Sequence, residues 1–450
     1  MKTRLMSACV RCLGWLVLPV LAATATAAEA PPLLLTHVTV IDGSGGAPRA
    51  NTTIAIDGKH ITAIYPDGSR AVPKGAQVED LAGKYAIPGL IDAHVHLTGA
   101  EPDIPRYAAH LQALLRGGVT AVRDMAGDDR LVGYLAGQAN TDLMPAPDIA
   151  YVALMAGPSF FTEDVRAQGS TVGVPLGTAP WMRAITPDTD LRLAVAEAKG
   201  TGASALKLYA NLTPDLVAKV TAEAHRQGMQ VWAHATIFPT RPSEEVAAGV
   251  DVLSHTPYLV WQAAATVPAD YRVRAMGDFT HVRPDAPAIV ALLKSMREHG
   301  TILDATLTPF LDEAEHQPQK VGAGIMAWSY AVTRLAHEMG VAVDVGADSS
   351  GLPRGAHGVD LTAMPTVHSE MALLVAHCGF TPLEAIHAAT AVGAAAMGQS
   401  DRRGTLAAGK LADVVVLSAD PSRDIHNTTR IEFVVKHGRI EPSRNRDGGS

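Results

Sequence analysis

The chain has 450 residues, of which 47% are hydrophobic, and its formal net charge at pH 7 is −8. A chain of this length accommodates one large domain and a smaller one, and its hydrophobic fraction is typical of a protein that buries a core. The acidic balance and the lack of a Lys/Arg cluster argue against a nucleic-acid partner.

The first thirty residues have the pattern of an export signal. A basic start precedes a short apolar run, and residues 23–30 offer several Ala-x-Ala cleavage points. The apolar run is too short for a stable membrane span. Removal of residues 1–30 leaves one cysteine, Cys378, so the mature chain forms no internal disulfide bond. We therefore expect a signal peptide over residues 1–30 and an exported enzyme, periplasmic or secreted.

Both ends of the remaining chain carry short strands with alternating hydrophobicity. Asp-Gly pairs separate three such runs within residues 37–64, and residues 413–417 and 431–438 have the same character. We expect residues 31–85 and 405–450 to combine into one small β-sandwich domain.

Between these ends, over residues 86–404, apolar strand-like runs alternate with helical stretches. The eight candidate strands are 86–97, 119–124, 149–154, 205–209, 230–234, 252–255, 302–307 and 341–348. Regular alternation of strand and helix is typical of a parallel barrel. The predicted fold class is therefore α/β, a (β/α)8 TIM barrel with the small β-sandwich domain attached.

Residues able to bind a metal ion occur at the ends of five candidate strands. His94 and His96 share one face of the first strand, about 7 Å apart along the chain, because strand side chains alternate. The other candidates, on later strands, are Lys207, His234, His255 and Asp348. Active sites of such barrels lie at the carboxyl ends of the strands, so we expect these residues to converge.

These motifs resemble those of the amidohydrolase superfamily, and the resemblance spans essentially the whole chain after residue 30. It rests on the His-x-His pair, on the strand GVTAVRD at residues 118–124 and on LAAGKLAD at residues 406–413. Residues 370–390 are similar to the imidazolonepropionase-related and prolidase-like (Xaa-Pro dipeptidase-like) branch.

The resemblance implies two divalent metal ions, with His94, His96 and Asp348 around one and His234 and His255 around the other. Mixed nitrogen and oxygen ligands suit Zn²⁺, although Mn²⁺, Fe²⁺ or Co²⁺ could occupy such a site.

Lys207 has two possible roles. By resemblance, CO₂ converts its amine to a carbamate that bridges the two ions. A buried lysine would otherwise need an acidic partner, and the alternative is a structural salt bridge with Asp124 or Asp304.

The implied activity is hydrolysis of an amide C–N bond in a dipeptide, N-acyl amino acid or cyclic amide. A water shared by two ions becomes hydroxide near neutral pH, and Asp348 would act as general base and then general acid. Two alternatives stay open. A mononuclear metal-dependent deaminase usually has a glutamate soon after the strand-five histidine, whereas Ala235 and Thr236 follow His234 here. A non-catalytic barrel scaffold would typically have lost ligands.

Two tyrosines are candidate substrate contacts. Tyr209, two residues past Lys207, would face the barrel mouth and donate to an oxyanion, or else simply pack there. Tyr258, three residues past His255, is the second candidate.

Other candidates concern the ends and side chain of the substrate. A substrate carboxylate could bind Arg123, Arg166 or Arg183, of which Arg123 lies at a strand end. Residues 156–185 read as an active-site lid whose aromatic residues, Phe160, Phe161 and Trp181, favour an apolar substrate side chain. His357 could serve a polar role nearby. We expect a small-molecule partner and, as in similar enzymes, a possible homo-oligomer.

Overall fold

The structure is a computed structural model that describes residues 31–99, 103–355 and 358–442. The predicted signal peptide and His357 lie outside the described residues, so export stays a prediction. Within the described ranges, no helix combines the length and the apolar character that crossing a membrane requires.

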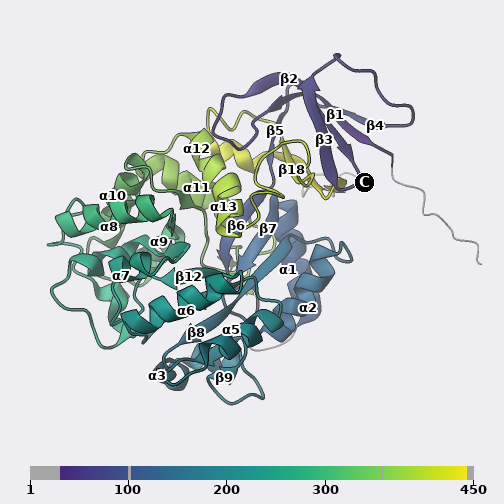
Figure 1. Cartoon of the computed structure of the whole chain (residues 1–450). Coiled ribbons are helices and arrows are strands. Elements are labelled where there is room, and N and C mark those ends of the chain that lie inside the picture. The colour runs from purple at the N-terminus through teal and green to yellow at the C-terminus, as the bar shows by residue number, and fades with distance from the viewer. Residues whose placement is uncertain (1–30, 100–102, 356–357, 443–450) are drawn as a thin grey trace, which may run out of the picture. The chain divides into compact units, whose positions relative to one another are not determined.

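Eight parallel strands form the barrel (Figure 1). In chain order they are β6 (Leu90–Val95), β7 (Val119–Asp124), β8 (Asp148–Ala156), β11 (Ala205–Leu208), β12 (Gln230–His234), β13 (Val252–Ser254), β14 (Ile302–Asp304) and β15 (Val343–Asp344). Each pairs in parallel with the next. Backbone hydrogen bonds close the ring, since Ala93 donates to the Val345 carbonyl (3.0 Å) and Asp348 to the His94 carbonyl (2.8 Å). The predicted TIM barrel is confirmed, and every predicted run overlaps one barrel strand.

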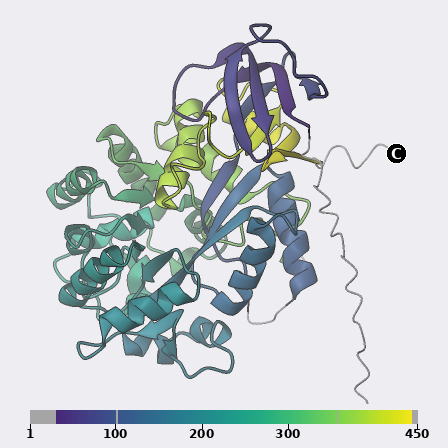
Figure 2. The same cartoon turned by 45° about the vertical axis from the view of Figure 1, so that its right-hand side comes forward.

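Helices connect the strands and lie outside them (Figure 2). The longer ones are α1 (Ile104–Arg116), α2 (Asp129–Asn140), α5 (Leu191–Gly200), α6 (Pro214–Arg226), α8 (Pro287–His299), α9 (Leu307–His316), α10 (Ile325–Glu338) and α11 (Thr366–His377). Helix α6 shows why they form there: Thr213 caps its first turn through the Leu216 amide, and its apolar residues, including Val217 and Val220, are buried on one face.

Shorter elements fill the connections. They are α3 (Pro158–Glu163), α4 (Val165–Gly169), β9 (Thr178–Ala179), β10 (Met182–Ala184), α7 (Pro242–Ala247), the 3₁₀ helices η1 (Thr256–Ala263), η2 (Tyr271–Met276), η3 (Pro318–Lys320) and η5 (Ile425–Thr429), β16 (Arg354–Gly355), β17 (Gly358–Val359), α12 (Pro382–His387), the π-helix η4 (Ala388–Val392) and α13 (Gly393–Ala396). The connections after β8 and β13 are long, and both contribute to the cavity described below.

The barrel interior is layered. An apolar layer contains one residue from each of several strands, among them Ala205, Trp232, Val252 and Ile302, and it meets Val392 and Ala396 from η4 and α13. Two residues further along the same strands come Lys207, His234, Ser254 and Asp304. Alternate residues of a strand share a face, so this second layer is polar and lies at the carboxyl ends of the strands.

Strands from both chain ends form one mixed eight-stranded sheet, seen as purple and yellow strands together in Figure 1. Its members are β1 (Leu33–Val40), β2 (Arg49–Asp57), β3 (His60–Pro66), β4 (Gln77–Asp80), β5 (Tyr85–Pro88), β18 (Val414–Leu417), β19 (Ile431–Lys436) and β20 (Arg439–Pro442). Strand β5 joins the two ends, because it pairs with both β1 and β18. The prediction that strands from both chain ends combine is confirmed; they form one sheet, while the bounds of a separate small domain stay a prediction.

Gly89 divides the predicted strand 86–97 in two. Before it, β5 belongs to the small sheet, and after it, β6 belongs to the barrel. The Gly89 amide donates to the Asp413 carbonyl (2.9 Å), and a Cβ at position 89 would lie 2.1 Å from Thr120 Oγ1. A side chain has no room there, so a glycine is required where the chain passes between the two sheets.

Candidate metal centre and active site

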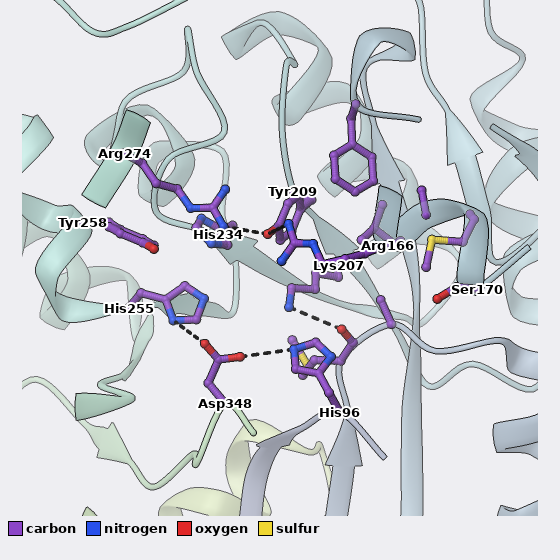
Figure 3. A pocket seen from close by; sticks show the side chains of 16 residues that line it. His96, Arg166, Ser170, Lys207, Tyr209, His234, His255, Tyr258, Arg274 and Asp348 are labelled. Atoms are coloured by element: carbon purple, nitrogen blue, oxygen red, sulfur yellow. Dashed lines mark hydrogen bonds and ion pairs between the residues drawn. The ribbon is translucent and has the colours of Figure 1, made fainter. Parts of the chain in front are cut away.

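The six predicted metal ligands come together at the carboxyl ends of the barrel strands. Five of them line one cavity, shown in Figure 3: His96, Lys207, His234, His255 and Asp348. The sixth, His94, is fully buried behind them, and its ring centroid lies 5.5 Å from that of His96 and 5.1 Å from that of His255. The predicted placement of His94 and His96 on the same face of one strand agrees with this geometry.

His94, His96 and Asp348 form the tightest group. Their ligand atoms lie within 4.8 Å of one another, and Asp348 Oδ1 is 3.2 Å from the Nε2 atom of each histidine. Two imidazole nitrogens and a carboxylate oxygen are donors that Zn²⁺ and related divalent ions prefer. These residues therefore fit a divalent metal ion.

Hydrogen bonds at Nδ1 orient three of the histidine rings. The pairs are His94 with Asp304 Oδ2 (2.5 Å), His234 with Thr236 Oγ1 (3.0 Å) and His255 with Thr306 Oγ1 (2.8 Å). His94 Nδ1 is hydrogen-bonded to Asp304, so Nε2 is the ring nitrogen that is left to face a metal ion. The same holds for His255, because the Thr306 hydroxyl donates to the Ala305 carbonyl (2.9 Å) and accepts from the ring.

Lys207 is buried among these groups. Lys207 is only 2% exposed. Its Nζ atom lies 3.3 Å from His94 Nε2 and 3.4 Å from the Met125 carbonyl oxygen. Among the described residues, neither Asp124 nor Asp304 forms an ion pair with it, so the predicted alternative of a structural salt bridge is not observed. Burial lowers the pKa of the Lys207 amine, despite the nearby charge of Asp348.

The charge states of the remaining ligands suit a cation. Burial raises the pKa of Asp348, but the positive charge of His94 and the hydrogen bonds from His94 and His96 outweigh it, so the pKa lies well below its usual range. Burial holds the pKa values of His234 and His255 well below 6.5, so both rings are neutral near pH 7. The site thus offers a carboxylate at Asp348 and neutral imidazoles at His234 and His255.

The cavity beside the candidate ligands has a volume of about 130 Å³. Its apolar wall consists of Met125, Ala126, Leu154, Phe160, Ala167 and Met182. Its polar lining, apart from the candidate metal ligands, consists of Arg166, Ser170, Tyr209, Tyr258 and Arg274. Figure 3 shows Arg274 and Tyr258 on one side, Arg166 and Ser170 on the other, and Tyr209 and Lys207 between them.

Residues 85–440 match the profile of the amidohydrolase family. The chain belongs to this family. It is similar to the imidazolonepropionase of Deinococcus radiodurans, with 26% identity over 372 residues, which are 80% of this chain and 84% of that protein. A solved structure of a putative prolidase from Bifidobacterium longum shares 25% identity, with a TM-score of 0.69 over 93% of this chain and 97% of that one. A Xaa-Pro dipeptidase shares 21% identity, with a TM-score of 0.70 over 92% and 100%.

These similarities confirm the predicted superfamily and its imidazolonepropionase-related and prolidase-like branch. At this level of detail the chain is an amidohydrolase that acts on carbon–nitrogen bonds of small molecules, in a family that generally uses divalent metal ions.

Two of the three predicted substrate contacts line the cavity of this amidohydrolase, namely Tyr209 and Tyr258. The prediction for Arg123 needs correction. Arg123 is fully buried, its Nη1 donates to the Ala396 carbonyl (2.7 Å), and its guanidinium lies 4.0 Å from the centre of the Trp232 ring. It therefore belongs to the layer beneath the histidines and does not reach the cavity.

Of the other two arginines predicted to bind a substrate carboxylate, one lines the cavity and one does not. Arg166 lines the cavity, whereas Arg183 does not and pairs with Glu197 (3.4 Å). Arg274, from η2, also lines the cavity and donates through Nη2 to Tyr209 Oη (2.7 Å). The sequence analysis missed Arg274 because no strand-end spacing marks it.

The predicted lid segment contributes one aromatic residue to the cavity wall, Phe160. Phe161 is buried against Phe160, and the Trp181 indole nitrogen donates to the Ser170 carbonyl (2.8 Å). These two aromatic residues hold the segment together and do not line the cavity.

Proposed function

We propose that this amidohydrolase cleaves the amide C–N bond of a dipeptide, N-acyl amino acid or cyclic amide with two divalent metal ions, most suitably Zn²⁺. The observation that carries the proposal is the convergence of Lys207 with His94, His96 and Asp348, with 3.3 Å between Lys207 Nζ and His94 Nε2. His94, His96 and Asp348 would hold one ion. His234 and His255, whose ring centroids are 4.4 Å apart, would hold the other.

We further propose that Lys207 is carboxylated. Its neutral amine adds to CO₂, an N–C bond forms, one proton is released, and the product is an anionic carbamate with two oxygens. Two features support this step: the side chain is buried, and no carboxylate of the described residues pairs with it. An ammonium group next to a metal ligand would repel a bound ion, whereas a carbamate on Lys207 would add a negative charge and oxygen ligands to the site.

Bound divalent ions would polarise the scissile carbonyl and lower the pKa of water in the site. Asp348 would accept a proton from the attacking water and deliver it to the departing nitrogen, so that the C–N bond breaks to give an acid and an amine. Its position at the cavity surface, with the side chain 23% exposed, allows contact with both groups.

Tyr209 would stabilise the oxyanion. Its phenol oxygen accepts N–H groups from Arg274 (2.7 Å) and Arg166 (3.0 Å), so its own hydrogen is left to donate to a substrate oxygen. Burial raises the pKa of Tyr209, but the charges of Arg274 and Arg166 outweigh it and lower the pKa, which strengthens the phenol as a donor.

The test is a screen of dipeptides, including Xaa-Pro, N-acyl amino acids and lactams, on metal-loaded wild-type protein and on Asp348→Asn. Asparagine keeps the shape and one ligand oxygen but accepts no proton. We expect kcat on the best substrate to fall by roughly 100-fold or more while most of the metal is retained.

The control is Asp312→Asn, since Asp312 is an exposed residue of α9 that pairs with His316. Metal content is measured on all three proteins. Wild-type turnover by Asp348→Asn would show that Asp348 is not the general base.

A further inference from the structure

Arg274 is a cation without an acidic partner among the described residues. Its side-chain hydrogen bonds go to phenol oxygens: Nη2 donates to Tyr209 Oη (2.7 Å), and Tyr258 is a second acceptor. Its guanidinium carbon lies 5.2 Å from the ring centres of Tyr209 and Tyr271 and 5.3 Å from that of Tyr258. Three phenol rings thus surround the guanidinium, which faces the cavity (Figure 3).

The neighbouring arginines are neutralised, which makes Arg274 distinctive. Arg166 pairs with Asp164 (2.5 Å), and Asp164 also accepts the Tyr271 hydroxyl (2.8 Å). Arg272, two residues before Arg274 on the same 3₁₀ helix, pairs with Asp270 (2.8 Å) and with Glu163 (3.5 Å).

The rings around Arg274 supply lone pairs and π-faces but no carboxylate. A partly buried guanidinium without a counter-charge is costly, and an anionic ligand would relieve that cost. Arginine also presents its N–H groups in a fork that matches a carboxylate, and the hydrogen-bond partners of Arg274 within the described residues are neutral phenols, Tyr209 and Tyr258.

The position of Arg274 relates this anion to the scissile bond. The Tyr209 oxygen that accepts from Arg274 is the group assigned above to the substrate carbonyl, so an anion held by Arg274 lies close to the reacting amide. In an N-acyl amino acid or a dipeptide, a single carbon separates the amide nitrogen from the carboxylate. That spacing suits an arginine adjacent to the oxyanion donor.

We propose that Arg274 binds a carboxylate of the substrate and that the enzyme therefore acts on carboxylated amides in preference to neutral ones, an inference that rests on the proposed amide hydrolysis. Candidate substrates are N-acyl amino acids and dipeptides with a free C-terminus. The apolar wall, with Leu154, Phe160 and Met182, accommodates the acyl portion.

The experiment compares an N-acyl amino acid with its C-terminal amide, which is nearly the same size but neutral. A third substrate carries its carboxylate on the acyl side, as the monoamide of a dicarboxylic acid. We measure kcat/KM for metal-loaded wild type, Arg274→Met, Arg274→Lys and the control Arg272→Met. The Arg272 side chain suits a control because it is 53% exposed and pairs with Asp270.

We expect wild type to prefer the acid over its amide by about 100-fold, and Arg274→Met to lose about 100-fold on the acid. Loss of the contact with Tyr209 would affect acid and amide alike, so the ratio between them isolates the carboxylate. Arg274→Lys should keep part of the preference, and Arg272→Met all of it. A preference for the acyl-side acid that depends on Arg274 would place the carboxylate on that part of the substrate.

Equal rates on acid and amide in wild type, or a ratio unchanged in Arg274→Met and Arg274→Lys, would overturn this inference and leave amide hydrolysis standing. Calorimetric titration of both ligands into metal-loaded Asp348→Asn separates the two failures. If no amide is hydrolysed, the proposed function fails. Tighter binding of the acid, lost in Arg274→Met, would still support the carboxylate site, and equal binding of acid and amide would refute it.

Discussion

The candidate histidine ligands are oriented by buried neighbours. Asp304, with its side chain fully buried, fixes the His94 ring through Nδ1. Gly346 leaves room for this pair, since a Cβ there would lie 2.6 Å from His94 Cβ and 2.4 Å from Asp304 Oδ1. Such outer residues constrain a metal site almost as strongly as the ligands themselves.

Lys207 offers the sharpest residue-scale prediction. Lys207→Ala should lose about one metal equivalent and most of the activity, roughly 100-fold or more, because the bridging anion is gone. Excess acetate or propionate should restore part of both by placing a carboxylate in the gap. Metal analysis and initial rates, with and without added carboxylate, measure this.

Lys219→Ala serves as the matched control, because Lys219 is an exposed lysine of α6 paired with Asp215. A Lys207→Ala protein that keeps two metal ions and the full rate would mean that Lys207 is merely structural.

At the scale of elements, strands were easier to predict than the connections between them. The convergence of positions 94, 96, 207, 234, 255 and 348 was predictable because strand alternation and the order of strand and helix are local properties of the sequence. Arg274 was not, since its place depends on how a long connection packs, for example through the Trp261 indole that donates to the Arg274 carbonyl (2.6 Å).

The depth of a side chain within the barrel was also not predictable from the sequence of a single strand. Arg123 stands one residue before the end of β7, which suggested a place at the mouth. The register between strands decides depth, and here Arg123 lies opposite Ala150 on β8 and stacks on Trp232, a residue of the apolar layer. Register depends on pairing with neighbours, which the sequence of β7 alone does not contain.

One helix–helix contact supports the metal centre from outside. Glu370 on α11 accepts the amides of Leu307 (2.6 Å) and Thr308 (2.8 Å) at the start of α9, and also the Thr308 hydroxyl. Thr306, just before α9, has a φ of +47°, a strained conformation for threonine, and its hydroxyl holds His255. Glu370 therefore fixes the residue that orients a metal ligand.

Glu370→Ala should lower the free energy of unfolding by about 2–3 kcal/mol, because buried amides at the helix start lose their acceptor. It should also weaken metal binding by roughly tenfold, through Thr306 and His255. Denaturant unfolding and metal titration measure the two effects.

The control is Glu315→Ala, since Glu315 is exposed on α9 and should change stability by less than about 0.5 kcal/mol. Unaltered stability and metal affinity in Glu370→Ala would contradict this account.

At the scale of the whole described chain, buried charges join the small sheet to the barrel. Asp148, the first residue of β8, accepts hydrogen bonds from Arg403, from Lys436 on β19 (2.6 Å) and from His437 (3.1 Å). All four side chains are at most 10% exposed. The chain also passes directly from one sheet to the other at Gly89. We therefore expect the stability of each sheet to depend on the other.

Acid should therefore weaken the molecule through Asp148. Burial raises the pKa of this carboxyl, but the His437 hydrogen bond and the charges of Arg403 and Lys436 outweigh it and hold the pKa well below its usual value of 3.8. A folded-state pKa below the unfolded one stabilises the protein at pH values above the unfolded pKa. That contribution is lost as the pH falls below about 4 toward the folded pKa.

Asp148→Asn should accordingly be less stable than wild type by about 3–5 kcal/mol at pH 7, because buried cations lose their counter-charge. The difference should stay constant down to about pH 5 and shrink below about pH 4, where the wild type loses the same contribution. Denaturant unfolding of both proteins across this pH range measures it, with Asp401→Asn, at an exposed aspartate, as the control. A difference that is absent at pH 7, or that grows on acidification, would show that the cluster does not hold the two sheets together.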